Sequence, residues 1–371
     1  MFEQQLSILV FRSAALGDFI LACPALAFIK QTYPAARIVL LTTQSNTRAQ
    51  REKVAAYTGT DTRVPWVEMV MPHLIDEVVV SHDLTSAAEI YAVRRRLKGQ
   101  YFQHAIILVD PASPWSGRLK KLLLIQALIG PVSVLGWRGK GSLNGDRARQ
   151  KRDGLLRHHV HGALQFLSEL NPPVFYSDAD IKFDLRPDSK ALQWVAEWID
   201  TNIPDNKRLV IVAPGSIQPH KRWPLKKFRQ LCVGILSTYS DVAIVVLGTP
   251  LDSSLGDELL SIDPKRVFNL AGKTNIAQSA ALLKNCALLV GNDGGAMHLG
   301  DAMGARVVSI IPGLEYPDSI EPWHNKELAI RHPVSCAPCY NYVRCPEGHN
   351  RCMVDLPLER VLSTCMSVLS H

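Results

Sequence analysis

The chain alternates short apolar runs with longer amphipathic stretches over most of its length. The apolar runs are bounded by turn-forming residues, a pattern typical of strands buried on both faces of a sheet. A first series of runs occupies residues 6–11, 37–41, 77–80, 104–109 and 132–135, and a second occupies residues 209–213, 242–247, 287–291 and 307–311. Helix-length segments lie between them, for example at residues 24–32, 192–201, 224–238, 276–284 and 296–303. This alternation predicts an α/β fold built on parallel sheets.

A cluster of helix and strand breakers separates the two series. Asn171-Pro172-Pro173, Arg186-Pro187-Asp188 and Ile203-Pro204-Asp205 interrupt the pattern, and 371 residues are enough for two domains. We therefore expect two Rossmann-like, doubly wound domains, residues 1–185 and residues 186–371, that face a central cleft. Such domains bind ligands at the carboxyl ends of their strands.

One strand end carries an unusually polar turn. Residues 288–290 are aliphatic and run into Gly291-Asn292-Asp293-Gly294-Gly295, which is followed by a helix containing His298. Adjacent glycines let the backbone approach a bound group, and the N–H groups of a helix start suit a phosphate. An ordinary turn, with Asp293 as helix cap and His298 as a packed residue, explains this segment equally well.

Two other strand ends carry candidate site residues. The first strand leads to Asp18, a carboxylate that could act as general base toward a hydroxyl, although a loop aspartate is more often a turn or cap residue. The strand at residues 209–213 leads to Ser216 and then to Lys221 and Arg222, just ahead of a helix that begins near Pro224. Two cations beside a helix N-terminus would stabilise a diphosphate without a metal ion. Trp223, the next residue, is expected in the core.

The charge balance points to an anionic partner. The net charge is +7, and basic residues concentrate in residues 94–96, 118–121 and 138–157. These clusters fit a phosphorylated substrate or an anionic membrane surface. Alternatively, they are solvated basic loops that bind no partner. They lack the interleaved aromatic residues of a nucleic-acid site, so no nucleic-acid partner is expected.

Other motifs and segments narrow the class of protein further. The chain contains neither a spaced-glycine dinucleotide fingerprint nor a Walker loop, which disfavours NAD and ATP. Its first residues lack the layout of a signal peptide, and no apolar segment is long enough to span a bilayer. We expect a cytoplasmic protein.

Four motifs, in this order, resemble glycosyltransferase family 9, the ADP-heptose:lipopolysaccharide heptosyltransferases. They are Ala15-Leu16-Gly17-Asp18 with Cys23-Pro24-Ala25-Leu26, Pro214-Gly215-Ser216 with Lys221-Arg222-Trp223-Pro224, Leu270-Ala271-Gly272-Lys273-Thr274, and Gly291-Asn292-Asp293-Gly294-Gly295-Ala296-Met297-His298. The resemblance implies a GT-B fold, with the acceptor on the N-terminal domain and the nucleotide-sugar on the C-terminal one. It also implies an inverting transfer that uses neither metal nor cofactor.

The resemblance assigns roles to residues of this chain. Asp18 matches the family's base, Lys221 matches the residue that holds the donor phosphates, and Asp293 matches the acid that binds hydroxyls of the donor sugar. The remaining donor-binding candidates are Ser216, Arg222, Gly294, Gly295 and His298. Family members often carry threonine where this chain has Gly294, so a hydroxyl that would contact a phosphate is missing.

These residues lead to a concrete functional expectation. The chain would be a cytoplasmic bacterial enzyme, peripheral at the inner face of the cytoplasmic membrane. It would move a sugar from an ADP-sugar to an anionic lipopolysaccharide-core or related glycan acceptor. Heptose is the favoured sugar. The alternatives are a GT-B hydrolase or epimerase of nucleotide-sugars, and a non-catalytic polyanion-binding protein. Candidate residues at three separate strand ends disfavour the binding protein.

The C-terminal segment is rich in cysteine. Four of the eight cysteines of the chain are Cys336, Cys339, Cys345 and Cys352, a spacing at which thiolates could ligate zinc. Only one Cys-x-x-Cys pair is present, so buried or redox-active thiols are favoured over a zinc site. A closing helix is expected at residues 356–369.

Overall fold

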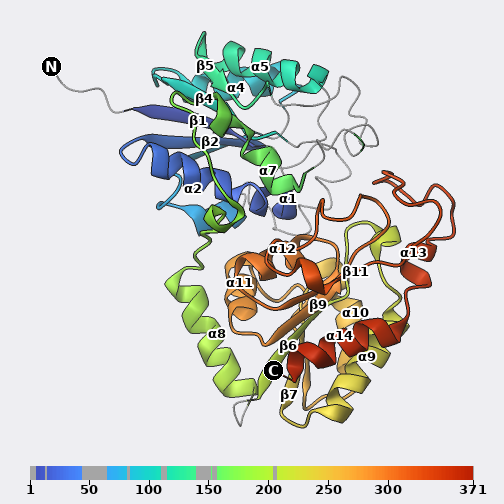
Figure 1. Cartoon of the computed structure of the whole chain (residues 1–371). Coiled ribbons are helices and arrows are strands. Elements are labelled where there is room, and N and C mark those ends of the chain that lie inside the picture. The colour runs from blue at the N-terminus through green and yellow to red at the C-terminus, as the bar shows by residue number, and fades with distance from the viewer. Residues whose placement is uncertain are drawn as a thin grey trace. The chain divides into compact units, whose positions relative to one another are not determined.

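The computed structural model describes residues 6–12, 15–43, 65–81, 84–109, 115–138, 152, 157–203 and 207–370. The chain divides into two compact units, Met1–Arg186 and Pro187–His371. Each unit is a parallel sheet covered by helices (Figure 1). The prediction of an α/β chain with two parallel sheets is confirmed.

The sheet of the first unit has five parallel strands in the order β3-β2-β1-β4-β5. The central strand β1 pairs with β2 on one side and β4 on the other, so that Val10 lies between Leu40 and Ile106. The strand order reverses between β1 and β4, which makes the carboxyl end of β1 a switch point of the kind where ligands bind. The strands are β1 (Ser7–Phe11), β2 (Arg37–Thr43), β3 (Glu77–Ser81), β4 (His104–Ile107) and β5 (Ser133–Leu135).

Helices supply the apolar side chains that bury this sheet. Leu9 and Phe11 of β1 pack in one cluster with Val93 of α4 and Ile125 of α5. Removing each such side chain from water contributes about 1.5–3 kcal/mol. The helical segments of this unit are α1 (Leu16–Ile20), α2 (Cys23–Thr32), η1 (Pro65–Val70), α4 (Ala87–Leu97), α5 (Trp115–Ile129), α7 (His159–Ala163), η2 (Gln165–Glu169) and η3 (Asp178–Asp180).

The sheet of the second unit has six parallel strands in the order β11-β10-β9-β6-β7-β8. Its switch point lies between β6 and β9, which pair through Ala213 and Gly291 at their carboxyl ends. A Cβ at Gly291 would lie 2.7 Å from the carbonyl oxygen of Ala213, so this close approach requires glycine. The strands are β6 (Arg208–Ala213), β7 (Val242–Val246), β8 (Val267–Asn269), β9 (Leu288–Asn292), β10 (Val307–Ile310) and β11 (Ala329–Ile330).

Helices α9 and α14 cover one face of this sheet and pack against each other (Figure 1). Trp223 is 1% exposed in this core, and its ring centroid lies 5.0 Å from that of Phe228 in an edge-to-face contact, so the prediction that Trp223 is a core residue is confirmed. The helical segments are α8 (Ser189–Asn202), η4 (Pro219–Lys221), α9 (Leu225–Thr238), η5 (Pro250–Asp252), α10 (Ser253–Leu260), α11 (Ile276–Lys284), α12 (Gly295–Ala302), η6 (Lys326–Leu328), α13 (Arg351–Val354) and α14 (Leu358–Leu369).

Asp18 occupies a different element from the one expected. The sequence pattern places it in a loop before a helix at Pro24, but it lies within the short helix α1. Phe19 and Ile20 are 1% and 0% exposed, and the N–H of Phe19 donates to the carbonyl oxygen of Ala15 at 2.9 Å. Burial of these two side chains stabilises a turn of helix that Gly17 alone would disfavour.

Across the described part of the chain, no helix combines the length and the apolar character needed to cross a bilayer.

Candidate functional site

The site of the second unit is built around an ion pair at its switch point. Asp293 follows β9 directly, and its N–H donates to the carbonyl oxygen of Ile310 at 3.0 Å, which extends the strand pairing by one residue. Lys221 ends the short helix η4 in the loop after β6. Its Nζ donates to Oδ2 of Asp293 at 2.8 Å. The strand order β9-β6 thus brings together two residues that are remote in sequence.

The surroundings of Asp293 keep its carboxylate charged. Its side chain is 6% exposed, and that of Lys221 is 16% exposed. Burial alone would raise the pKa of Asp293, but the charges of Lys221, His298 and Arg331, together with the Lys221 hydrogen bond, lower it below its usual range. An ammonium group has three N–H donors, so Lys221 can hold Asp293 and also donate to a bound anion.

The two glycines after Asp293 lead into α12. Gly294 has extended backbone (φ 169°), and a Cβ built there meets only the carbonyl oxygen of Asn292, at 4.0 Å. The structure therefore has room for a side chain at position 294. His298 is 6% exposed in the first turns of this helix, close enough to influence the pKa of Asp293.

Arg222 is held by a second buried carboxylate. Its Nε donates to the carbonyl oxygen of Ser216 at 2.8 Å, and its Nη2 lies 3.9 Å from Oδ1 of Asp252. Asp252 is 4% exposed, and its Oδ2 accepts hydrogen bonds from the N–H (3.0 Å) and Oγ1 (2.7 Å) of Thr249. A Cβ at Gly215 would lie 2.4 Å from this carboxylate, so glycine lets the β6 loop pass over Asp252.

Sequence reasoning did not single out Asp252. The signal was present as Thr249-Pro250-Leu251-Asp252, the spacing of a helix-capping box just after a buried strand. Asn292 was also passed over, although it stands inside the most informative motif. It is 2% exposed and hydrogen-bonded to the loop that carries Lys221.

The cysteine-rich segment reaches the same site through an aromatic residue. The ring of Tyr342 lies 5.8 Å from Nζ of Lys221, close enough for a cation–π contact. The N–H of Tyr340 donates to the carbonyl oxygen of Leu314 at 3.0 Å, and the rings of Tyr316 and Tyr340 meet edge to face. The segment therefore lies beside the ion pair and is anchored to the loop after β10.

The four cysteines of this segment are free, unbridged and partly buried. Sγ of Cys345 accepts a hydrogen bond from the N–H of Asn350 at 3.4 Å. Among the residues that the structure describes, no three or more histidine, cysteine or acidic side chains converge in a way that could hold a metal ion. The zinc site at Cys336, Cys339, Cys345 and Cys352 stays an alternative prediction.

Asp18 lies in the first unit, at the switch point of its sheet. The side chain of Asp18 is exposed. The backbone carbonyl oxygen of Asp18 accepts a 2.9 Å hydrogen bond from Nη2 of Arg12. Nη1 of Arg12 donates to the carbonyl oxygen of Leu108, also at 2.9 Å. Arg12, another residue that sequence reasoning passed over, thus ties α1 to the segments that follow β1 and β4. Ser216, Lys221, Arg222, Asp293, Gly294, Gly295 and His298 all lie at the switch point of the second unit.

The matching family model and the curated relatives agree on one family. The family described as "Glycosyltransferase family 9 (heptosyltransferase)" matches residues 90–349. The chain is 26% identical over 254 residues to the lipopolysaccharide heptosyltransferase 2 of Salmonella typhimurium, an alignment that covers 64% of this chain and 69% of that protein.

Two solved structures are similar over nearly the whole length of the chain. The E. coli ADP-heptose lipopolysaccharide heptosyltransferase II has a TM-score of 0.64 at 18% identity, covering 98% of this chain and 99% of that one. The family 9 glycosyltransferase of Veillonella parvula has a TM-score of 0.72 at 20% identity, covering 100% and 99%.

Proposed function

This chain belongs to glycosyltransferase family 9, and from that premise we propose that it transfers a heptose from ADP-heptose to a lipopolysaccharide-core acceptor. Its fold is GT-B, with two parallel-sheet α/β domains. As a member of this family the chain is a glycosyltransferase, which excludes the non-catalytic polyanion binder among the alternatives. The observation that carries the proposal is the Lys221–Asp293 pair at the switch point of the second unit.

The donor site of the proposal uses the charges around that pair. Lys221 and Arg222, in the loop that contains Ser216, offset the charge of the donor diphosphate. Asp293 accepts hydrogen bonds from hydroxyls of the donor sugar. The N–H groups at the start of α12, after Gly294 and Gly295, and the side chain of His298 complete the diphosphate and ribose site. Residues 186–371 would thus bind the donor, and residues 1–185 the acceptor.

The proposed reaction is an inverting transfer without a metal ion. The carboxylate of Asp18 takes the proton of an acceptor hydroxyl as its oxygen forms a bond to the anomeric carbon. The bond between that carbon and the diphosphate oxygen breaks on the opposite face, and ADP leaves with the electron pair. Positive charge from Lys221 and Arg222 stabilises the leaving group as its charge develops.

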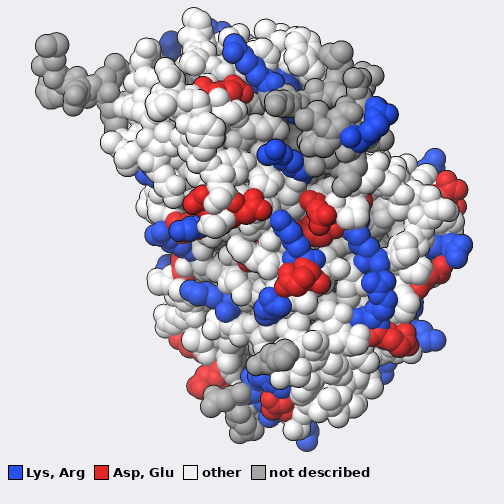
Figure 2. Space-filling view, in the orientation of Figure 1, with Lys and Arg blue, Asp and Glu red and all other residues white. Residues whose placement is uncertain are grey.

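The proposal includes peripheral contact with the inner face of the cytoplasmic membrane. Tyr91, Arg94 and Arg95 are exposed and lie at helical spacing on one face of α4, with Tyr91 65% exposed, and the exposed Lys98 follows the end of this helix. Such a face suits an anionic headgroup region. On the view in Figure 2, basic and acidic side chains are mixed over the described surface of the second unit. Most of the basic stretch at residues 138–157 lies outside the described residues.

A product assay tests the transfer. The full chain is incubated with ADP-heptose, with and without a heptosylated lipopolysaccharide-core acceptor, and ADP release and product mass are followed. We expect ADP release that depends on the acceptor and a product heavier by one heptose. ADP release at the same rate without acceptor would indicate a hydrolase instead, and a changed sugar on intact nucleotide would indicate an epimerase.

A ligand screen tests the donor. A specific ligand of the folded state raises the melting temperature, so nucleotide-sugars are compared by thermal shift. We expect ADP-heptose to raise the melting temperature more than UDP- or GDP-sugars do. A larger shift with a UDP-sugar would contradict the proposed donor.

A further inference from the structure

We propose that Asn292 is a positioning residue that fixes both ends of the loop carrying Lys221. The side-chain Nδ2 of Asn292 donates to the carbonyl oxygen of Pro214 at 2.7 Å, and Oδ1 accepts from the N–H of Trp223 at 2.9 Å. Pro214 directly follows β6, and Trp223 lies two residues before Leu225, where α9 begins. A single side chain at the end of β9 therefore holds the two ends of the segment formed by residues 215–222.

The loop between these ends contains internal hydrogen bonds. The N–H of Lys221 donates to the carbonyl oxygen of Gln218 at 3.0 Å, and the N–H of Arg222 donates to that of Pro219 at 3.1 Å. Nε of Arg222 reaches back to the carbonyl oxygen of Ser216. Because these bonds make the loop a compact body, its position depends on its ends and on the contacts of Lys221 and Arg222. Asn292, the last residue of β9, holds the ends of the loop, and Asp293, the next residue, holds the lysine.

The amide chemistry of Asn292 matches this task. Asn292 is 2% exposed, and its two partners are one acceptor and one donor of the backbone. A side-chain amide supplies one donor and one acceptor from the same planar group. A carboxylate of the same shape could still accept from Trp223, but it would face the carbonyl oxygen of Pro214 with no hydrogen to share. Trp223 has a second anchor, because its Nε1 donates to the carbonyl oxygen of Leu356 at 3.1 Å.

The aspartate variant of Asn292 would therefore lose the hydrogen bond to Pro214, at the start of the loop. With that end released, residues 215–222 sample positions in which Lys221 no longer sits beside Asp293. Ordering them again when a donor binds costs conformational entropy, which weakens binding without removing any group that touches the donor. This consequence rests on the proposed role of Lys221 at the donor diphosphate.

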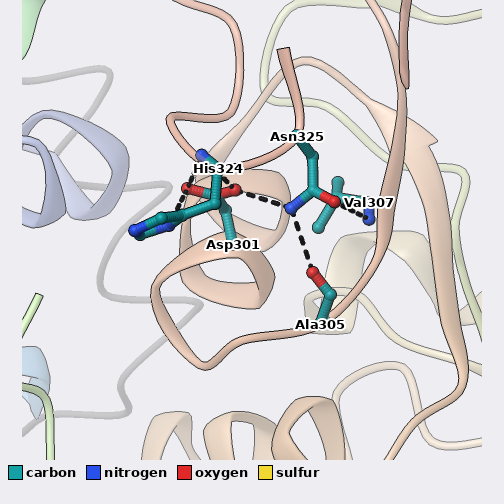
Figure 3. A network of polar contacts seen from close by, with 5 residues as sticks. All are labelled: Asp301, Ala305, Val307, His324 and Asn325. Carbon is teal, nitrogen blue, oxygen red and sulfur yellow. Dashed lines mark hydrogen bonds and ion pairs between the residues drawn. The ribbon is translucent and has the colours of Figure 1, made fainter. Parts of the chain in front are cut away.

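The same unit contains a matched control. Asn325 is also 2% exposed, and its amide joins two backbone groups: Nδ2 donates to the carbonyl oxygen of Ala305 at 3.0 Å and Oδ1 accepts from the N–H of Val307 at 3.2 Å (Figure 3). Nδ2 also donates to Oδ1 of Asp301 at 2.8 Å. Val307 begins β10, whereas Asp293 adjoins the carboxyl end of the same strand. Asn325 thus clamps backbone at the opposite end of the sheet from the Lys221 loop.

The experiment compares Asn292→Asp with Asn325→Asp in the full chain. ADP affinity is measured by calorimetry, stability by melting temperature, and motion of residues 215–222 by amide hydrogen exchange without ligand. We expect Asn292→Asp to weaken ADP binding about tenfold and to speed exchange in residues 215–222 about tenfold, since both report release of the loop. Asn325→Asp should lower the melting temperature and leave ADP affinity and amide exchange in residues 215–222 unchanged. Asn325→Asp also places a carboxylate beside the buried Asp301. Asn292→Ala and Asn325→Ala, which remove the side-chain hydrogen bonds without adding charge, therefore replace the aspartate variants if either of these does not fold.

A double-mutant cycle separates positioning from general destabilisation. If Asn292 acts through Lys221, then Asn292→Asp has little further effect on ADP binding once Lys221→Met is present. Fully additive effects, or a slow-exchanging loop with ADP affinity unchanged in Asn292→Asp, would overturn the proposal. The wild-type chain could also bind no ADP while Asn292→Asp still speeds amide exchange in residues 215–222. That result would support the positioning role of Asn292 and contradict the proposed donor.

Discussion

The carboxylate of Asp293 accepts a 2.8 Å hydrogen bond from Lys221, a residue 72 positions earlier in the chain. The two residues follow neighbouring strands, β9 and β6, of one parallel sheet. Because both side chains are largely buried, each charge depends on the other for its stabilisation. The pair therefore supports the fold of this site and, in the proposed function, provides the cation that receives the donor diphosphate.

Replacing Lys221 by methionine should expose this dependence. The variant leaves the buried carboxylate of Asp293 without its closest cation, which raises the pKa of Asp293 and lowers the free energy of unfolding, by about 3 kcal/mol if the pair behaves as a buried one. Urea unfolding measures the loss. The double variant Lys221→Met with Asp293→Asn is the control, because removing both charges should recover part of the stability. A double variant less stable than the sum of its parts would contradict this account.

Asp18→Asn tests the proposed base in the first unit. The amide keeps the shape of the side chain but cannot accept a proton at neutral pH, so kcat should fall by about 10²- to 10⁴-fold. ADP binding, which depends on the second unit in the proposed function, should be unchanged by calorimetry. Asp200→Asn on the exposed side of α8 serves as the matched control and should leave kcat intact. Full activity of Asp18→Asn would remove Asp18 from the mechanism.

Gly294→Thr should be accepted by the fold and should tighten donor binding. Position 294 has extended backbone and open space around the added Cβ, and the new hydroxyl would sit at the start of α12 where a phosphate is proposed. We expect the KM for the nucleotide-sugar to fall about threefold, the scale of one added hydrogen bond. Gly294→Ala, which fills the same space without a hydroxyl, should leave KM unchanged. Equal effects of both substitutions would show that the hydroxyl has no partner in the donor.

The His324–Asp301 pair should make stability depend on pH (Figure 3). Nδ1 of His324 lies 3.2 Å from Oδ2 of Asp301, and this hydrogen bond raises the pKa of His324 against the opposing effects of its partial burial and of Lys326. A raised folded pKa stabilises the folded state fully below the unfolded value of about 6.5 and loses that effect as pH rises through the folded pKa. Urea unfolding of His324→Gln and wild type should therefore differ most near pH 6 and converge in alkaline buffer. A difference in the free energy of unfolding that grows with pH would contradict a raised pKa of His324.

The hydrophobic pattern was sufficient for the inner strands of the second sheet. β6, β7, β9 and β10 lie within about a residue of the predicted runs, because a strand buried on both faces must be apolar throughout. The short strands Val267–Asn269 and Ala329–Ile330 were missed. So short a segment carries no measurable periodicity, and its pairing is decided by the neighbouring strand.

The structure brings together candidate residues that a sequence motif carried, whereas sequence reasoning passed over residues that act as single side chains. Lys221 and Asp293 were found from their places after strands, and the structure brings them together. Asp252 and Asn292 act through hydrogen bonds to backbone groups, and such bonds leave no repeating pattern in a sequence. Arg12 was missed for the same reason, since its partners are carbonyl oxygens.

By itself, the sequence determined the α/β class, the two series of strands and the residue types that stand at the strand ends. Those features depend on local burial and turn chemistry, which each segment carries in its own side chains. Only the tertiary structure decided that β6 lies beside β9, that Lys221 therefore meets Asp293, and that Asn292 holds the loop between Pro214 and Trp223. Strand order is set by the packing of the whole sheet and its helices, so contacts between distant strand ends exist only once the core has formed.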